Sequence, residues 1–188
     1  MCNDYRYRLP IERLIEEFSH QKIPLVFPSG IPNTEPRDDI RISDSAPVVL
    51  PGPEGASLQT LPWSWKGPTG KPVFNFRSDG RRFPSGRCLI PADGFYEFTT
   101  PEDPSKKRKD KWLFTLKGAE LFAIAGVVRE GAWAMLTTAP GPDIAPYHDR
   151  QVVLLRPEQW ADWLSSGPNE AQLLVPTPPG ALTIEQVG

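Results

Sequence analysis

The chain has 188 residues, of which 39% are hydrophobic and 23% charged, a composition typical of a folded globular protein and not of a disordered one. No uncharged apolar run reaches the roughly 18 residues of a membrane span, and the first residues, MCNDYRYRLP, lack the apolar core of a secretory signal. We therefore expect a cytoplasmic protein without a membrane segment. The net charge of −2 excludes attraction to nucleic acid through an overall basic field, so any such contact must use a local patch.

One helix is predicted near the start of the chain, between Pro10 and Gln21. Apolar residues recur there at i, i+3, i+4 and i+7, and Pro10 suits the first turn of a helix. Residues 22–72 are rich in Pro, Gly and Ser and predict loops with brief strands, of which Val48-Val49-Leu50 is the clearest.

Several β-type runs follow, separated by turn residues: 72–76, 87–98, 112–117, 121–128, 133–138 and 151–155. The charged segment 101–111 is predicted to be a hairpin loop. A second helix is predicted from Pro157, with Trp160, Trp163 and Leu164 on one face, and residues 165–188 are predicted to form an irregular C-terminal strap. We expect a single α+β domain over residues 1–188, with a largely antiparallel, barrel-like sheet core and a few peripheral helices.

Metal-ligating residues are scarce, because the chain has only two cysteines, Cys2 and Cys88, and two histidines, His20 and His148. A structural zinc site would need four ligands, so we expect neither a metal nor an organic cofactor. Two cysteines in a cytosolic type of chain are expected to be reduced.

Cys2 is the first candidate for chemistry. Removal of Met1 would leave a cysteine with a free α-amine, whose pKa of roughly 7.7–8 leaves a useful neutral fraction at physiological pH. Such an amine condenses with an aldehyde to an imine, and the neighbouring thiol can close a thiazolidine ring. The alternative is that Cys2 is an ordinary second residue in a frayed terminus.

Three further segments carry candidate residues. Asn75 is unusual at the end of an apolar run and predicts a hydrogen-bonding role, while Arg77 could contact a phosphate. The alternative is that Asn75 forms a turn and Arg77 is solvated. Glu97 lies among aromatic residues, which favours a raised pKa and acid–base work, unless it faces solvent. His148 can titrate near neutrality and Arg150 can pair with phosphate; the alternative is a surface loop.

In this order, Cys2, the Asn-x-Arg-Ser-acid element at 75–79, the Ile-Pro-Ala-Asp-Gly-Phe-Tyr-Glu-Phe element at 90–98 and His-Asp-Arg at 148–150 resemble the SRAP family, the SOS response-associated peptidases. The resemblance spans roughly residues 1–164. It implies a DNA-damage protein that captures abasic sites in single-stranded DNA covalently through Cys2.

The same resemblance implies the roles of individual residues. Asn75 would position the Cys2 amine and the sugar, Glu97 would transfer protons, and His148 would assist opening of the sugar ring. The DNA contacts implied for this chain are Arg77, Arg150, Thr137 and Trp65. The peptidase activity would be self-removal of Met1 at the same site, and the protein would act as a monomer.

Four segments depart from the family pattern. The chain has Asn3-Asp4 where the family has Gly-Arg, so Arg6 or Arg8 is expected to replace that arginine. Asp79 shortens a glutamate and Asp44 replaces an asparagine, and a Trp-Gly-x-x-Pro-x-Trp region is reduced to 61–65. Two other functions stay open. One is a non-catalytic single-strand binder that uses Trp63 and Trp65, and the other is a cysteine peptidase with a Cys2–His148 pair.

Overall fold

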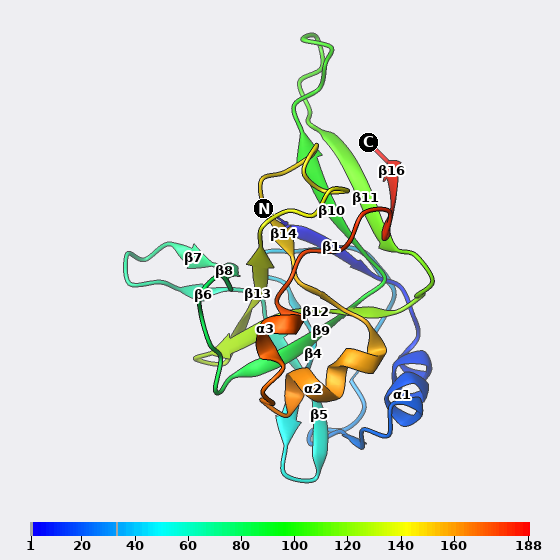
Figure 1. The fold of residues 1–188 in the computed structure, drawn as a ribbon, viewed down its shortest axis with the longest axis vertical. Coiled ribbons are helices and arrows are strands. Elements are labelled where there is room, and N and C mark those ends of the chain that lie inside the picture. Colours follow the sequence, from blue (N-terminus) through cyan, green and yellow to red (C-terminus); the bar gives the residue numbers. More distant parts are fainter. Residues whose placement is uncertain (1, 33) are drawn as a thin grey trace.

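Strands dominate the computed structural model of the protein, which describes residues 2–32 and 34–188 (Figure 1). Within those residues the larger sheet has nine strands, seven of them in the order β14-β13-β12-β9-β4-β5-β2, with β8 paired to β13 and β15 to β12. The strands are β2 (Leu25–Val26), β4 (Ser45–Gly52), β5 (Gly55–Pro62), β8 (Asn75–Arg77), β9 (Arg87–Ala92), β12 (Phe122–Arg129), β13 (Ala132–Thr138), β14 (Gln151–Val152) and β15 (Leu154–Leu155).

The smaller sheet has five strands in the described chain, in the order β16-β11-β10-β1-β3, all antiparallel. They are β1 (Asp4–Tyr7), β3 (Arg37–Arg41), β10 (Gly94–Thr99), β11 (Asp110–Leu116) and β16 (Leu182–Gln186). A short separate hairpin joins β6 (Trp65–Lys66) to β7 (Pro72–Val73). The predicted hairpin loop is confirmed, and it connects β10 to β11 at the top of Figure 1.

The run predicted over 87–98 is two strands, not one, and this correction positions the site. β9 belongs to the larger sheet and β10 to the smaller one, so the chain changes sheets at Asp93. Asp93 is held there by Arg6 of β1, whose Nε lies 3.2 Å from the Asp93 carboxylate. A Cβ on Gly94 would come within 2.8 Å of Leu113 Cδ1 and 3.3 Å of Arg6 Nε, so a larger residue after the turn would displace these side chains. The guanidinium of Arg6, one of the two candidates to replace the family arginine, is thus already paired with Asp93.

Aromatic side chains fill the core where the sheets meet. Trp63 and Trp133 stack with ring centroids 4.9 Å apart, and Tyr5 of β1 packs edge-on against both. The buried indole N–H groups donate to backbone carbonyls, Trp63 to Phe74 and Trp133 to Leu61, each at 2.9 Å. Trp63 is 0% exposed, so it cannot stack on a nucleobase as the single-strand-binder alternative required.

The helices are short and lie outside the sheets (Figure 1). The first prediction is confirmed by α1 (Ile11–His20), which buries Leu14 and Phe18. The second helix is confirmed as the turn η1 (Pro157–Gln159) followed by α2 (Trp160–Leu164). In the described part of the chain, no helix is long and apolar enough to cross a membrane.

Two predictions about the architecture need correction. Residues 165–188 are not an irregular strap, because they contain the helix α3 (Glu170–Leu173) and the strand β16, which pairs with β11 from Leu182 to Gln186. The expected barrel-like closure is not confirmed, since the strand pairings of residues 2–32 and 34–188 leave both sheets open. The fold is mixed α and β, mostly sheet, with few helices.

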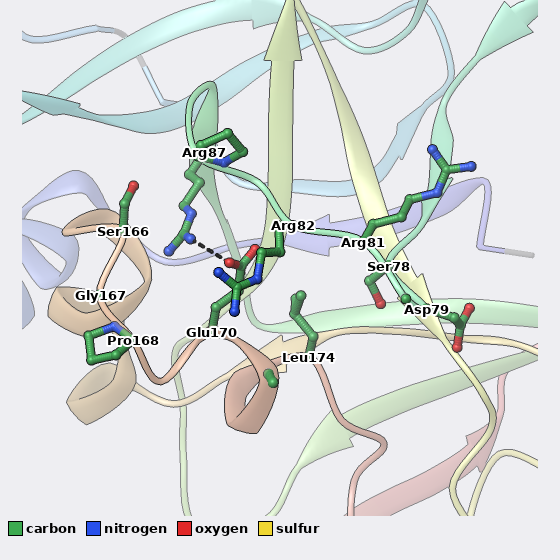
Figure 2. Close-up of a pocket in the computed structure, with 13 residues that line it drawn as sticks. Ser78, Asp79, Arg81, Arg82, Arg87, Ser166, Gly167, Pro168, Glu170 and Leu174 are labelled. Carbon is green, nitrogen blue, oxygen red and sulfur yellow. Dashed lines mark ion pairs between the residues drawn. The ribbon is translucent and has the colours of Figure 1, made fainter.

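A buried arginine ties β9 to the C-terminal segment beside a cavity of about 570 Å³ (Figure 2). The Arg87 guanidinium is 2% exposed, lies 3.0 Å from Glu170 Oε2, and stacks on the Trp163 ring at 4.6 Å. It also donates to the carbonyl oxygens of Phe83 and Trp163. The second carboxylate oxygen of Glu170 accepts the Phe83 N–H at 2.7 Å.

Glu170→Ala is therefore expected to lower the free energy of unfolding by about 3 kcal/mol, because it leaves a buried guanidinium charge without its counter-ion. Urea unfolding followed by tryptophan fluorescence measures this change. Glu158→Ala, at an exposed carboxylate, is the control and should stay within about 0.5 kcal/mol of the unmodified protein. A Glu170 variant as stable as the control would contradict this account of the pair.

Candidate functional site

Cys2 lies two residues before the start of β1, at the junction of the two sheets, and its side chain is 1% exposed. The thiol donates a hydrogen bond to the carbonyl oxygen of Asp4 at 3.3 Å. Burial raises the pKa of the Cys2 thiol far above its ordinary value, and the nearby charge of Glu97 acts in the same direction. The sulfur is therefore a protonated thiol in this state. Cys88 is also free and buried.

Asn75, on the larger sheet, contacts the backbone of Cys2. It begins β8, which pairs in parallel with β13 so that Asn75 is opposite Met135. The Asn75 amide donates from Nδ2 to the Cys2 carbonyl oxygen at 2.8 Å. Its Oδ1 is buried and has no hydrogen-bond partner among the residues that the structure describes. The amide thus fixes the backbone of Cys2 and keeps one acceptor beside it.

Glu97 reaches the same place from the smaller sheet. Tyr5 of β1 is opposite Phe95 of β10, and continuing this antiparallel register brings the residues before Asp4 beside Glu97. The side chain is 2% exposed, and burial raises the pKa of its carboxyl from 4.5 to about 7. Near neutrality the group holds a proton part of the time, as a general acid and base must. The alternative of a solvent-facing Glu97 is wrong.

His148 is held over the smaller sheet by the turn before β14. The neighbouring Tyr147 packs edge-on against Trp112 and Phe114 of β11, with centroids 4.8 and 5.2 Å apart. His148 Nδ1 accepts the backbone N–H of Arg150 at 3.0 Å, so this nitrogen faces its own turn.

Burial also lowers the pKa of His148, so the neutral ring predominates at pH 7. The Asp149 carboxylate lies 2.8 Å from Nδ1 and opposes this shift, and its charge also raises the pKa of Glu97. The same negative charge thus acts on both groups. Among the predicted catalytic residues, Asn75 is bonded to Cys2, the charge of Glu97 acts on the Cys2 thiol, and that of Asp149 acts on both Glu97 and His148.

Arg150 and Thr137 form a buried support behind these groups. The Arg150 guanidinium lies 2.6 Å from Asp79 Oδ2, and it donates to the Thr137 carbonyl at 2.8 Å and hydroxyl at 3.2 Å. The pairing lowers the pKa of Asp79. Thr137 is 1% exposed and its carbonyl also accepts the Ser78 N–H at 2.9 Å. Asp79 thus holds the Arg150 guanidinium, and phosphate contact by Arg150 stays a prediction.

Arg77 and Trp65 lie on an aromatic and basic surface beside Asn75. Arg77 is exposed, and Trp65 is half-buried with its ring 6.5 Å from that of Phe76. The guanidinium of Arg129 lies over both rings, at 5.8 Å from Trp65 and 5.0 Å from Phe76. Arg81, which lines the cavity of Figure 2, lies over Phe76 at 4.7 Å. Exposed cations over aromatic rings are typical of single-strand binding surfaces.

Arg81 and Arg129 were missed at the level of sequence. Each follows a turn or ends a strand, and no local pattern distinguishes it from an ordinary surface arginine. The available signal was the phenylalanine between Asn75 and Arg77, because an aromatic ring with an accessible face attracts cations. Arg8 is exposed and pairs with Asp38 at 3.5 Å.

The fold and the site define a mixed α and β protein with a buried cysteine near the start of the chain, at the junction of two sheets. A model of the family described as "SOS response associated peptidase (SRAP)" matches residues 1–188. The chain belongs to the SRAP family.

Curated relatives are named abasic site processing proteins. The chain is 32% identical over 188 residues to YoqW of Bacillus subtilis, with 88% of this chain and 80% of the relative covered. It is 26% identical over 190 residues to YoaM of the same organism, with 88% and 79% covered.

Among solved structures, a protein from Bordetella bronchiseptica has the same fold, with a TM-score of 0.74, 21% identity and 100% of both chains covered. A phage-related protein from the same organism matches with a TM-score of 0.72 and 21% identity, covering 99% of this chain and 94% of that one.

Proposed function

We propose that the protein captures abasic sites in single-stranded DNA by forming a thiazolidine between Cys2 and the sugar aldehyde. The observation that carries the proposal is that Asn75 of the larger sheet bonds the Cys2 carbonyl, while Glu97 of the smaller sheet is near enough for its charge to act on the Cys2 thiol. The curated relatives, as abasic site processing proteins, support the substrate class. We further propose that residues 1–188 form one domain that acts as a monomer in the cytoplasm.

The reaction needs an α-amine on Cys2, and therefore loss of Met1, which lies outside the described residues. The neutral amine adds to the aldehyde carbon, and the resulting hydroxyl leaves as water to form an imine. The thiol then adds across the C=N bond, with sulfur bonding to carbon and the thiol proton passing to nitrogen. Aldehyde and aminothiol thus give thiazolidine and one water, without a cofactor.

The protonation states of the site support an order in which the amine acts first. The Cys2 thiol is held protonated, so it does not compete as a thiolate for the aldehyde. Glu97, with a pKa of about 7, delivers the proton to the departing hydroxyl, and His148 assists opening of the sugar ring. Asn75 fixes the Cys2 backbone, which aims the amine.

The cysteine-peptidase alternative requires a Cys2 thiolate activated by His148. The thiol donates instead to the Asp4 carbonyl, and burial opposes its ionisation, which disfavours a thiolate nucleophile. We therefore propose that any peptidase activity is limited to release of Met1. Mass spectrometry of the purified protein tests this step, since a retained Met1 would block the amine.

The test of the main proposal is a crosslinking assay without added reductant. The protein is incubated with a single-stranded oligonucleotide that contains one abasic site, then denatured and separated by electrophoresis. A heat-stable shifted band is expected, because a thiazolidine survives denaturation. A single-strand binder or a peptidase gives no band, so its absence with protein that lacks Met1 rules out the proposal.

Arg77→Ala is expected to weaken binding of undamaged and abasic strands alike, because a phosphate contact does not depend on the base. The slope of log affinity against log salt should fall by about 0.7, the value for one phosphate contact on a single strand. Fluorescence anisotropy across salt concentrations measures both. Lys117→Ala, at the end of β11 away from the hairpin, is the control and should change neither. A slope unchanged by Arg77→Ala would refute the contact.

A further inference from the structure

A second cavity, of about 610 Å³, opens between the base of the β10–β11 hairpin and the start of β1. It begins one residue after Cys2. The residues that matter for its chemistry come from β1, β3, β10 and the hairpin loop: Asn3, Asp4, Arg41, Phe98, Arg108 and Lys109. The chain therefore has a hollow of nucleotide size next to the proposed nucleophile, on the smaller-sheet side.

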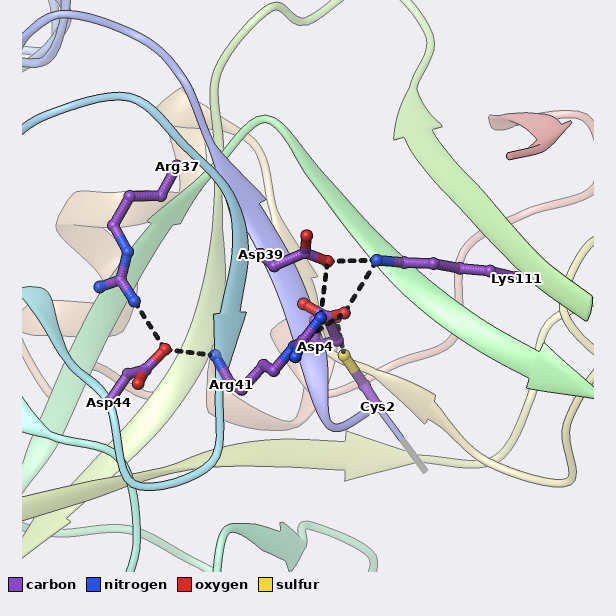
Figure 3. A network of polar contacts seen from close by, with 7 residues as sticks. All are labelled: Cys2, Asp4, Arg37, Asp39, Arg41, Asp44 and Lys111. Atoms are coloured by element: carbon purple, nitrogen blue, oxygen red, sulfur yellow. Dashed lines mark hydrogen bonds and ion pairs between the residues drawn. The ribbon is translucent and has the colours of Figure 1, made fainter. Parts of the chain in front are cut away.

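Beside this cavity, two cationic side chains pair with two carboxylates, so their charges cancel (Figure 3). Lys111 Nζ donates to Asp4 Oδ2 at 2.9 Å and also to Asp39. Arg41 lies 3.9 Å from Asp4 and 3.8 Å from Asp39. Two cations thus face two carboxylates. Asp4, which replaces the arginine of the family pattern, is neutralised by this network and leaves no net negative charge at the entrance.

The rim carries the uncompensated charge. Arg108 and Lys109 are both exposed, and neither forms an ion pair with any residue that the structure describes. In the same loop Lys106 is paired with Asp110 at 3.0 Å. The cavity therefore has two free positive charges at its mouth above a neutral floor, an arrangement suited to a phosphodiester.

The cavity and Arg77 lie on different sides of Cys2. The Cys2 carbonyl is bound by Asn75 of β8, two residues before Arg77 on the larger sheet, whereas the chain after Cys2 enters the cavity on the smaller sheet. Lys109 also lies close enough to His148 for its charge to lower the pKa of that imidazole, in addition to burial. The cavity rim thus adjoins the reacting groups.

We propose that this cavity binds a backbone phosphate of the captured strand through Arg108 and Lys109, on the side of the abasic nucleotide opposite to Arg77. The inference rests on the proposed function, because it assumes that the strand crosses Cys2. It assigns a binding role to a charged segment that sequence alone predicts only to be a hairpin loop. It also explains how the chain dispenses with the arginine that Asp4 replaces.

The test compares two double variants with the same loss of charge. Arg108→Ala/Lys109→Ala removes the rim cations, and Lys106→Ala/Lys107→Ala removes two cations of the same loop that do not line the cavity. With undamaged single-stranded DNA, the first should reduce the salt slope by about 0.7 to 1.4 and weaken binding several-fold at low salt. The second should leave the slope unchanged.

Two abasic oligonucleotides then locate the contact, one with the abasic site at its 5′ end and one with it at its 3′ end. The rim variant should slow capture of only the oligonucleotide whose nucleotides extend over the cavity, and Arg77→Ala should slow capture of only the other. Equal slowing of both by the rim variant, or slowing equal to that of the control variant, overturns the cavity proposal.

Failure of the proposed function gives a different result. If the unmodified protein without Met1 forms no adduct with either oligonucleotide, capture is wrong, and the salt slopes alone decide whether the cavity binds phosphate. If it forms adducts while both double variants behave alike in both assays, capture stands and the cavity assignment falls.

Discussion

Cys2→Ala is expected to abolish the heat-stable adduct with an abasic oligonucleotide while leaving the fold intact. Alanine keeps the α-amine and can still form an imine, but it has no sulfur to close the ring, so the product hydrolyses on denaturation. At least a hundredfold loss of shifted band is expected. Borohydride treatment before denaturation should recover a band from this variant, because it reduces the imine to a stable amine.

Cys88→Ala is the matched control, because Cys88 is equally buried and free but lies within β9. It is expected to form the adduct at the normal extent, apart from any loss of stability from the small cavity created. An undiminished heat-stable band from Cys2→Ala would show that another residue supplies the ring-closing group, and the thiazolidine proposal would then be wrong.

Glu97→Gln is expected to slow adduct formation by about 10²–10⁴-fold, the usual contribution of a positioned acid or base, with little effect on binding. The unmodified protein should show a bell-shaped rate profile. The rate rises as the α-amine loses its proton near pH 7.7–8 and falls as Glu97, with a pKa of about 7, loses its own. The glutamine variant should lack the falling limb.

The rate of adduct formation at saturating protein, measured from pH 5.5 to 9, tests this assignment. Glu102→Gln, in the exposed hairpin loop, is the control and should keep the bell-shaped dependence of the rate on pH. Rates from Glu97→Gln that match the control would exclude an acid–base role. Loss of DNA binding together with rate would show that Glu97 acts through structure alone.

The Glu97 carboxyl should also make the free energy of unfolding depend on pH, in a direction that its raised pKa fixes. Its pKa is higher in the folded state, about 7, than the ordinary 4.5, so the folded protein retains a proton that the unfolded chain has lost. The favourable contribution of Glu97 is complete below about pH 4.5 and is lost as the pH rises through 7. Glu97→Gln should therefore be more stable than the unmodified protein at pH 8, by about 3 kcal/mol at most, and equally stable near pH 4.

The predictions from sequence succeeded where a local pattern has only one good structural solution. The 3.6-residue periodicity of α1 predicts a helix that buries one face, and the continuous apolar runs of β12 and β13 predict strands that are buried on both faces. The run 87–98 was misjudged for a physical reason. Its change of sheet at Asp93 depends on Arg6, which is 87 residues away and invisible to any local pattern.

β16 was missed for a similar reason. Residues 165–188 contain proline-rich turns that predict irregular chain, yet Leu182 and Ile184 alternate along the edge of β11. An edge strand of this kind is selected by its neighbour rather than by its own composition.

The sequence predicted candidate site residues, but it did not predict the side chains that hold the residues around them. The aminothiol argument for Cys2 and the aromatic setting of Glu97 follow from residue chemistry. The neutralisation of Asp4 by Lys111, and the use of Arg150 to hold Asp79, require residues from different strands. Whether a charged side chain is free or already paired is decided by tertiary contacts, and sequence alone does not contain that information.

The division of the site between the two sheets has a consequence for how the protein can be tuned. Cys2 and Glu97 are positioned by the smaller sheet and Asn75 by the larger one, and Tyr5 of the smaller sheet packs against Trp63 and Trp133. A misalignment of about 1 Å can cost a reaction about a hundredfold. The packing of the two sheets against each other therefore sets the distance between the reacting groups. Substitutions in the core can change the rate of capture without altering any group that touches DNA.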